Sequence, residues 1–195
     1  MAPVGALLLG YLLGSIPFGL ILTRLFGAGD LRQIGSGNIG ATNVLRTGRK
    51  GLAAATLLLD LAKGFAAVKL AGLIFPGNEM PAAAAVFLGH CYSIWLRFRG
   101  GKGVATLMGI TLALYWPCAL VFALVWLAML AALRISSVAG MAAALSAPVS
   151  AALFGAFDAV PVLLALALLV VWKHRGNIDR LLQGAEPRIG GGARG

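Results

Sequence analysis

The sequence has little acidic charge and few of the residues that bind metals. Six Asp and Glu residues stand against sixteen Lys and Arg, giving a formal net charge of +10, with only two cysteines and two histidines. Cys91 and Cys118 fit no disulfide or zinc spacing, and we expect neither a metal nor another cofactor. No Lys or Arg precedes Arg24, so the first apolar segment lacks the basic start of a cleavable signal peptide and is expected to remain a membrane span.

Polar residues are also too few to coat a water-soluble core. The chain is 60% hydrophobic with a mean hydropathy of +0.93, which indicates an integral membrane protein. In such a protein, excess positive charge is typical of cytoplasmic loops and of surfaces for anionic substrates or lipids. We therefore expect membrane lipids, and no nucleic acid, among its partners.

Seven apolar segments predict an all-α membrane protein with seven transmembrane helices. They are Val4–Thr23, Leu52–Phe75, Ala82–Leu96, Val104–Tyr115, Cys118–Leu133, Val138–Phe154 and Val160–Trp172. The uncharged run 103–133 is either one very long helix or a hairpin broken near Trp116 and Pro117, because proline cannot continue a helix without losing a hydrogen bond.

The distribution of cations favours the hairpin. It places four loops on one side, and these loops hold fourteen of the sixteen Lys and Arg residues: 24–50, 96–103, 134–137 and 173–195. The positive-inside rule then puts the N-terminus outside and the C-terminus in the cytoplasm. We expect residues 1–195 to form a single membrane domain of the bacterial plasma (inner) membrane, with cytoplasmic loops at 24–51, 96–106 and 173–190.

The first polar segment, residues 35–51, reads GSGNIGATNVLRTGRKG in an otherwise apolar chain. Its hydroxyl and amide side chains are Ser36, Asn38, Thr42 and Asn43. One helical turn would place Thr42 and Asn43 on one face with Arg46. Because a guanidinium can bind a phosphate or carboxylate through two parallel hydrogen bonds, the segment is a candidate anion site. The alternative is a flexible basic loop.

The second polar segment, residues 97–106, reads RFRGGKGVAT at the predicted start of the fourth span. Gly100, Gly101 and Gly103 allow a ligand oxygen close to the backbone, Lys102 adds a point charge, and a helix N-terminus adds free N–H groups. The P-loop spacing is absent, so nucleotide binding is not implied. A glycine hinge flanked by stop-transfer charges is the alternative.

The third polar segment, residues 173–190, reads KHRGNIDRLLQGAEPRIG. Its spacing of Ile and Leu predicts a short amphipathic helix along the membrane surface, with His174 and Asn177 on one face. The alternative is a solvated basic tail.

The second predicted span contains three charges, Asp60, Lys63 and Lys69, of which Asp60 and Lys63 lie three residues apart. Charges inside a span are costly unless paired or functional, and their spacing predicts an internal ion pair that fixes helix packing. His90, at the end of the third predicted span, is expected to be a structural hydrogen-bonding residue.

Three motifs, GSGNIGATNVLR, GHCYSIWLRFRGGKGVAT and HRGNIDRLLQGAEPR, resemble those of the bacterial acyl-phosphate:glycerol-3-phosphate acyltransferase (PlsY) family. The resemblance covers the whole chain. One departure is Ser93, where the family usually has proline, and we expect it to loosen the start of the second motif. The resemblance implies transfer of an acyl group from acyl phosphate to the 1-hydroxyl of glycerol 3-phosphate, giving lysophosphatidic acid.

The resemblance also implies which residues act. Ser36, Arg46, Lys102, His174 and Asn177 would bind the two phosphates, and Asn38, Thr42, Asn43, Gly100, Gly101 and Gly103 would line the substrate site. Acyl phosphate is already activated, so holding two anions together is the main task. A soluble acyl-phosphate synthase is a further expected partner.

Two other functions remain open from the sequence. His174 and Asp179 spell HxxxxD, a motif of acyltransferases that use acyl thioesters, although five residues turn a helix by about 500° and leave the two side chains on different faces. A small transporter of anionic or phosphorylated solutes is the second alternative, but its site would lie near the membrane midplane, where only Asp60 and Lys63 are placed.

Overall fold

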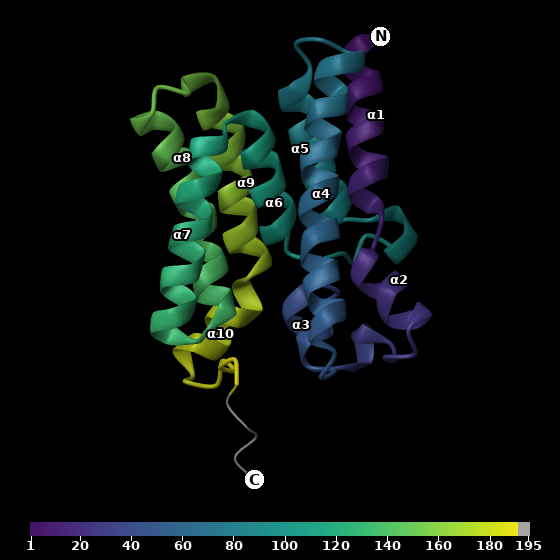
Figure 1. Ribbon diagram of the computed structural model, residues 1–195, viewed down its shortest axis with the longest axis vertical. Helices are drawn as coiled ribbons and strands as arrows, with labels where there is room; N and C mark the ends of the chain where they lie inside the picture. Colours follow the sequence, from purple (N-terminus) through teal and green to yellow (C-terminus); the bar gives the residue numbers. More distant parts are fainter. Residues whose placement is uncertain (191–195) are drawn as a thin grey trace. The chain divides into compact units, whose positions relative to one another are not determined.

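The computed structural model describes residues 1–190, in which all regular secondary structure is helical (Figure 1). The helices are α1 (Ala2–Ser15), α2 (Phe18–Leu25), α3 (Ala41–Leu45), α4 (Lys50–Ile74), α5 (Glu79–Cys91), α6 (Val104–Leu114), α7 (Trp116–Leu133), α8 (Ser136–Leu153), α9 (Val160–Lys173) and α10 (Arg175–Leu182), with short 3₁₀ helices η1 (Leu31–Gln33), η2 (Ile94–Leu96) and η3 (Phe157–Ala159). The chain folds as two compact units, residues 1–114 (unit 1) and 115–195 (unit 2).

Among the described residues, three helical stretches are long and apolar enough to cross a membrane. They are Ala2–Leu25, Trp116–Leu133 and Ser136–Leu153, and a fourth is counted if Phe157–Lys173 and Arg175–Leu182, bent by 54°, form one span. A helix satisfies its own backbone hydrogen bonds, which is what a segment in lipid requires.

In unit 1, α1, α4 and α5 lie side by side, and α6 packs on α4 (Figure 1). Small buried residues allow α1 and α5 to approach closely: Ala6, Gly10, Gly14, Ala82 and Ala83. Such small-residue faces are typical of helix pairs in membranes, where association depends on close packing. This bundle carries the first and second polar segments.

The first predicted span is not one continuous helix. It breaks between α1 and α2 at Pro17, which has no N–H to continue the ladder. Two carbonyl groups at the break are satisfied from elsewhere: Lys63 Nζ donates to Ile16 O at 2.8 Å, and Ser93 Oγ donates to Ser15 O at 2.7 Å. The apolar span predicted over Val4–Thr23 is present, but as two helices, α1 and α2.

Helix α5 begins earlier and ends earlier than the predicted span Ala82–Leu96. It runs over Glu79–Cys91, after which the chain turns into η2. The last carbonyls of a helix have no partner within it. Here His90 O accepts from Gly101 N at 3.0 Å and Cys91 O accepts from Gly100 N at 3.1 Å, so the second polar segment caps α5.

The long uncharged run is interrupted, as the hairpin interpretation required. Helix α6 ends at Leu114, Tyr115 is extended with φ −156° and ψ 100°, and α7 begins at Trp116. Pro117 lies in the first turn of α7, where its missing N–H removes no intrahelical bond. One uninterrupted helix over this run is excluded.

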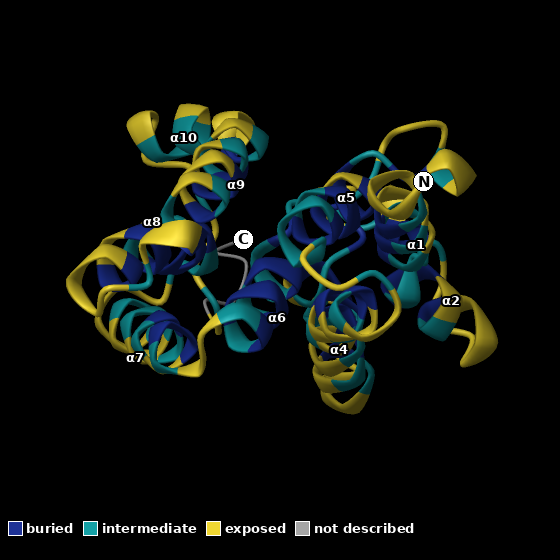
Figure 2. Cartoon of the chain, turned by 90° about the horizontal axis from the view of Figure 1, so that it is seen from above, coloured by how far each residue is buried: buried dark blue, intermediate teal, exposed yellow. Residues whose placement is uncertain are grey.

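In unit 2, α8 packs against both α7 and α9 through buried small residues. Leu120, Leu124 and Leu127 of α7 are exposed, and Figure 2 shows the burial of each helix by colour. Exposed leucines along a helix of this length are expected to face lipid chains.

Candidate active site

The first polar segment is organised around the side chain of Asn43, which is 2% exposed. Its Nδ2 donates to the carbonyls of Leu31, Ile34 and Asn38 at 3.0, 2.9 and 2.8 Å. Its Oδ1 accepts from the backbone N–H of Ser36 at 3.3 Å. We call these residues the Asn43 cluster. One neutral side chain thereby fixes a loop that has little regular structure.

Arg46 is attached to the edge of this cluster and remains exposed. Its Nη1 donates to Asn43 Oδ1 at 3.4 Å, the long end of hydrogen-bonding range. Gly35 lies beneath both side chains with φ +53°, and a Cβ there would be 2.6 Å from Arg46 Nη1 and from Asn43 Oδ1. Glycine is therefore required at position 35. Ser36 and Thr42 are exposed beside Arg46, as an anion site needs.

Asp30 and Arg32, which precede this loop, form an exposed ion pair. Asp30 caps η1 by accepting from the Arg32 backbone N–H at 3.0 Å and from Arg32 Nε at 2.9 Å. These hydrogen bonds lower the pKa of Asp30 well below its usual range and raise the pKa of Arg32. The Arg32 guanidinium is thus oriented before it meets any ligand.

The second polar segment lies against the end of α5. Besides the two backbone bonds that cap α5, Gly101 leaves room for the His90 ring, since a Cβ at Gly101 would lie 2.2 Å from His90 Nε2. Gly103 precedes the first turn of α6, and Leu107 N donates to Gly103 O at 2.7 Å. Lys102 is half-buried on this fixed loop.

Ser93 holds the start of the second polar segment in place, contrary to the expected loosening. Its side chain is buried, and its hydroxyl donates to Ser15 O at 2.7 Å. The preceding residue, Tyr92, is also bonded to α1, because its carbonyl accepts from the Tyr11 hydroxyl at 2.8 Å. Serine therefore replaces the stiffness of a proline ring with a hydrogen bond to α1.

The predicted ion pair in α4 is confirmed and includes a third member. Lys63 Nζ lies 2.7 Å from Asp60 Oδ1, and both side chains are buried. His90 Nδ1 lies 3.6 Å from the same oxygen. Because His90 also contacts Gly101, the buried pair is linked through one imidazole to the loop that carries Lys102.

In unit 2, the third polar segment is organised around Glu186, whose side chain is 6% exposed. Its Oε1 accepts from Ser137 Oγ at 2.7 Å and Asn177 Nδ2 at 2.5 Å, and its Oε2 accepts from Arg180 Nε at 2.8 Å. We call these residues the Glu186 cluster. Burial alone would raise the pKa of Glu186, but these three hydrogen bonds outweigh it and lower the pKa.

His174 occupies the corner between α9 and α10. It is 4% exposed, and its Nδ1 lies 2.8 Å from Val170 O, so the hydrogen on Nδ1 points into α9. The backbone N–H of Asn177 donates to His174 O at 2.7 Å. The predicted amphipathic helix is present as α10, and His174 and Asn177 lie at its buried start.

These motifs and this fold have close counterparts among known proteins. The family model described as Glycerol-3-phosphate acyltransferase matches residues 4–184. Two relatives of that name, from Erythrobacter litoralis (strain HTCC2594) and Mesorhizobium japonicum, are 57% and 55% identical to this chain, over 96% and 95% of it and 95% of each relative. The chain belongs to the glycerol-3-phosphate acyltransferase family.

Solved structures of a relative agree with this membership. PlsY, described as an integral membrane glycerol 3-phosphate acyltransferase, is 36% identical to this chain in two crystal structures, which cover 97% of this chain and 96% of the relative. The glycerol 3-phosphate form gives a TM-score of 0.92 and the lysophosphatidic acid form one of 0.88. The family fold is therefore that of an all-helical integral membrane protein.

Within the acyltransferase fold, the structure groups some predicted site residues and gives others a supporting contact. Ser36, Asn43 and Arg46 share one cluster in unit 1, and His174 and Asn177 share one corner in unit 2. Asn38 contributes only a carbonyl to the Asn43 cluster. Sequence reasoning did not identify Glu186.

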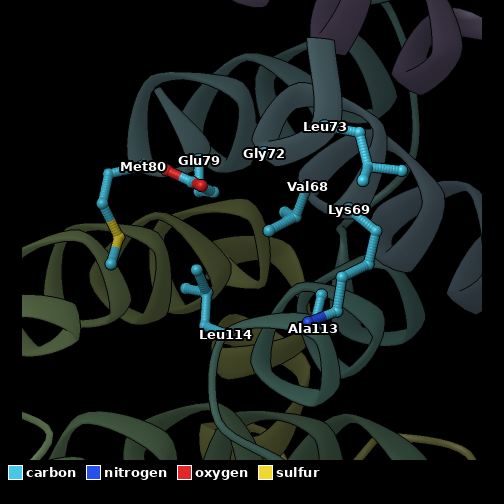
Figure 3. Close-up of a pocket in the computed structure, with 8 residues that line it drawn as sticks. All are labelled: Val68, Lys69, Gly72, Leu73, Glu79, Met80, Ala113 and Leu114. Atoms are coloured by element: carbon cyan, nitrogen blue, oxygen red, sulfur yellow. The ribbon is translucent and has the colours of Figure 1, made fainter. Parts of the chain in front are cut away.

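A separate hollow of about 490 Å³ lies along the second half of α4 (Figure 3). It is lined by Val68, Lys69, Gly72, Leu73, Glu79, Met80, Ala113 and Leu114. The first polar segment leads into the other end of α4, at Lys50, and the hollow's two charged side chains, Lys69 and Glu79, have opposite signs. We therefore place the candidate site at the polar segments and not in this hollow.

Proposed function

We propose that this protein transfers a fatty acyl group from acyl phosphate to the 1-hydroxyl of sn-glycerol 3-phosphate, giving lysophosphatidic acid for phospholipid biosynthesis. The observation that carries the proposal is the match to the acyltransferase family over residues 4–184, which include the first two polar segments and most of the third. The donor and the site residues are supported by the chemistry of those segments.

The reaction needs no activated nucleophile from the protein. The substrate hydroxyl oxygen attacks the carbonyl carbon of the mixed anhydride, the new ester bond forms, and the bond from that carbon to the phosphate oxygen breaks. Inorganic phosphate leaves and accepts the hydroxyl proton. The protein has to hold two anions side by side and offset their repulsion, which positioned cations and N–H groups can do.

We assign the phosphate contacts to Ser36, Arg46, Lys102, His174 and Asn177. Arg46 is supported by its exposure and by its attachment to a rigid cluster, and Lys102 by the loop that caps α5. The substrate-binding group comprises Asn38, Thr42, Asn43, Gly100, Gly101 and Gly103. For Asn43, Gly100 and Gly101 we propose that binding is indirect, through the shape of the loops.

The thioester alternative is not favoured by the corner at His174. His174 is buried, whereas Asp179 is exposed in the middle of α10. A catalytic dyad requires the two side chains within hydrogen-bonding distance. Because His174 is buried and Asp179 is exposed, we favour a donor that is already activated, such as acyl phosphate.

One assay distinguishes the candidate functions. Purified protein is given glycerol 3-phosphate with either acyl phosphate or acyl-CoA of the same chain length, and lysophosphatidic acid is measured. We expect product only with acyl phosphate, and Arg46→Ala serves as the inactive control. Product only with acyl-CoA would establish the thioester mechanism. Uptake of glycerol 3-phosphate by vesicles without any product would establish the transporter.

We also propose seven spans within a single domain of the bacterial inner membrane, with the N-terminus outside and the three polar segments in the cytoplasm, where a soluble acyl-phosphate synthase can deliver the donor. The test is labelling of single cysteines at Glu79 and Gln183 with a membrane-impermeant thiol reagent. The two positions should react from opposite sides. Reaction of both from one side would contradict this topology.

A further inference from the structure

The loop between α5 and Lys102 carries an exposed surface that the acyl transfer does not use. Ile94, Trp95 and Phe98 are 50%, 65% and 59% exposed. Beside them lies a hollow of about 560 Å³, lined by Trp95, Leu96, Arg97, Arg99 and, from η1, Arg32. We call these residues, from Ile94 to Arg99 together with Arg32, the arginine–tryptophan surface.

The backbone of this surface is held in an unusual conformation. Arg97 and Phe98 have φ values of 50° and 63°, a region that side chains other than glycine seldom adopt. The turn is maintained because Phe98 N donates to Ser93 O at 2.9 Å, and Ser93 is itself bonded to α1. The loop therefore presents its cations and its aromatic rings from a fixed backbone.

The charges of this surface are available for a ligand. Arg32 shares its charge with Asp30, but within residues 1–190 the structure pairs neither Arg97 nor Arg99 with a carboxylate. A guanidinium matches the geometry of a phosphate group through parallel N–H donors. Two such groups beside a hollow form a site for a phosphate oxyanion.

The apolar residues identify which phosphate compound fits. Trp side chains are enriched at the level of lipid headgroups, and basic residues near a membrane surface attract anionic lipids. A small soluble anion would gain nothing from Ile94, Trp95 and Phe98. A phospholipid offers an anionic headgroup to the arginines and acyl chains to the apolar residues at once.

We propose that the arginine–tryptophan surface binds the headgroup of an anionic phospholipid from the leaflet on the side of the polar segments. The site is separate from the residues assigned to the two substrates, and it stands whether or not acyl phosphate is the donor. Because Arg97 and Arg99 lie at the start of the second polar segment, a few residues before Lys102, bound lipid holds the approach to Lys102 in place.

Native mass spectrometry of the purified full chain with added phosphatidylglycerol tests the site. Arg97→Ala/Arg99→Ala should weaken phosphatidylglycerol binding by about tenfold or more, since charge-assisted hydrogen bonds to phosphate are among the strong ones. Arg49→Ala is the matched control: it removes one exposed cation outside the surface and should leave binding within about twofold. Equal binding by the double variant and the wild type would overturn the proposal.

Two further arms keep the result interpretable. If the double variant does not fold, Arg99→Gln alone gives the test, because Arg99 has no positive φ.

In a second experiment, acyl phosphate is added in competition with phosphatidylglycerol. Retention of phosphatidylglycerol under saturating acyl phosphate supports a lipid site, whereas full displacement would make the surface a donor site and overturn the proposal. Zwitterionic phosphatidylcholine binding as tightly as phosphatidylglycerol would also overturn it.

Discussion

The Asn43 cluster and the Glu186 cluster each fix the conformation of a polar segment, the first through a neutral amide and the second through a carboxylate. Asn43 is neutral and donates mainly to backbone carbonyls, so it shapes a loop without using other side chains. Glu186 is a carboxylate that accepts from three side chains, one of which, Asn177, is itself a proposed phosphate ligand. In the first cluster, the side chain that shapes the loop is not itself assigned a direct contact to phosphate. In the second, stability and binding share a residue.

Removal of the exposed cation beside the Asn43 cluster should have the largest effect on activity. Arg46→Ala is expected to lower turnover by about 10²-fold or more, because a bidentate, charge-assisted contact to phosphate is lost. Its side-chain hydrogen bond to Asn43 Oδ1 is long, at 3.4 Å, so thermal stability in detergent should hardly change. Lys102→Ala should reduce turnover similarly, and Arg49→Ala is the control. Normal turnover in either site variant would refute the assigned role.

The Asn43 side chain should account for the stability of its loop. Asn43→Ala removes the amide that bonds three carbonyls. Leu31 O and Ile34 O keep backbone donors, whereas Asn38 O loses its donor, at a cost of about 1–3 kcal/mol if it stays buried. The unfolding transition should move to clearly lower temperature, and activity should fall with it. Asn78→Ala, which removes bonds to two nearby carbonyls at the start of α5, should cost less. Equal losses would contradict a central role for Asn43.

Of the two clusters, the Glu186 cluster should respond to acid, because its central side chain is a carboxylate. The pKa of Glu186 is 4.5 in the unfolded chain and lower in the folded protein. Glu186 therefore stabilises the fold at pH values above 4.5, and this stabilisation is lost as the pH falls through the folded pKa. Glu186→Gln should cost about 1–3 kcal/mol at neutral pH and should remove that acidic decline. Unfolding midpoints of both proteins from pH 7 to pH 3 give the comparison. Parallel curves would show that Glu186 is not the responding group.

The smallest effect is expected at Asp179. Asp179→Asn should keep activity with acyl phosphate within about twofold, because the side chain is exposed and general base catalysis, worth about 10²–10⁴-fold, is not assigned to it. His174→Ala and Asn177→Ala should each lower activity more. A collapse of Asp179→Asn in a folded protein would instead establish a dyad with His174.

The sequence predicted the helices well because apolar run length is a local property. The starts of α4 and α6 and the end of α7 lie within two residues of the predicted segments. The interruption at Tyr115 was also anticipated, since Pro117 cannot continue a helix. These features depend on neighbouring residues alone.

The contacts that define the site depend on distant residues, and sequence reasoning therefore missed them. The break at Pro17 is stable because Lys63, 47 residues from Ile16, and Ser93, 78 residues from Ser15, supply donors. The family resemblance named Asn43 as a ligand, but only the fold shows its amide turned toward the backbone. Nothing local distinguishes a carboxylate such as Glu186 from one in a solvated tail.

The bond between Lys63 and Ile16 also bears on how the chain enters the membrane. An isolated helix pays about 2.5–3.5 kcal/mol to insert a Lys or Asp near its centre, and α4 carries Asp60 and Lys63 there. Ile16 is synthesised before α4, so its carbonyl is already present when Lys63 arrives. Helix α1 thus provides α4 with a polar partner during translation, and we expect the two helices to leave the insertion machinery as a pair.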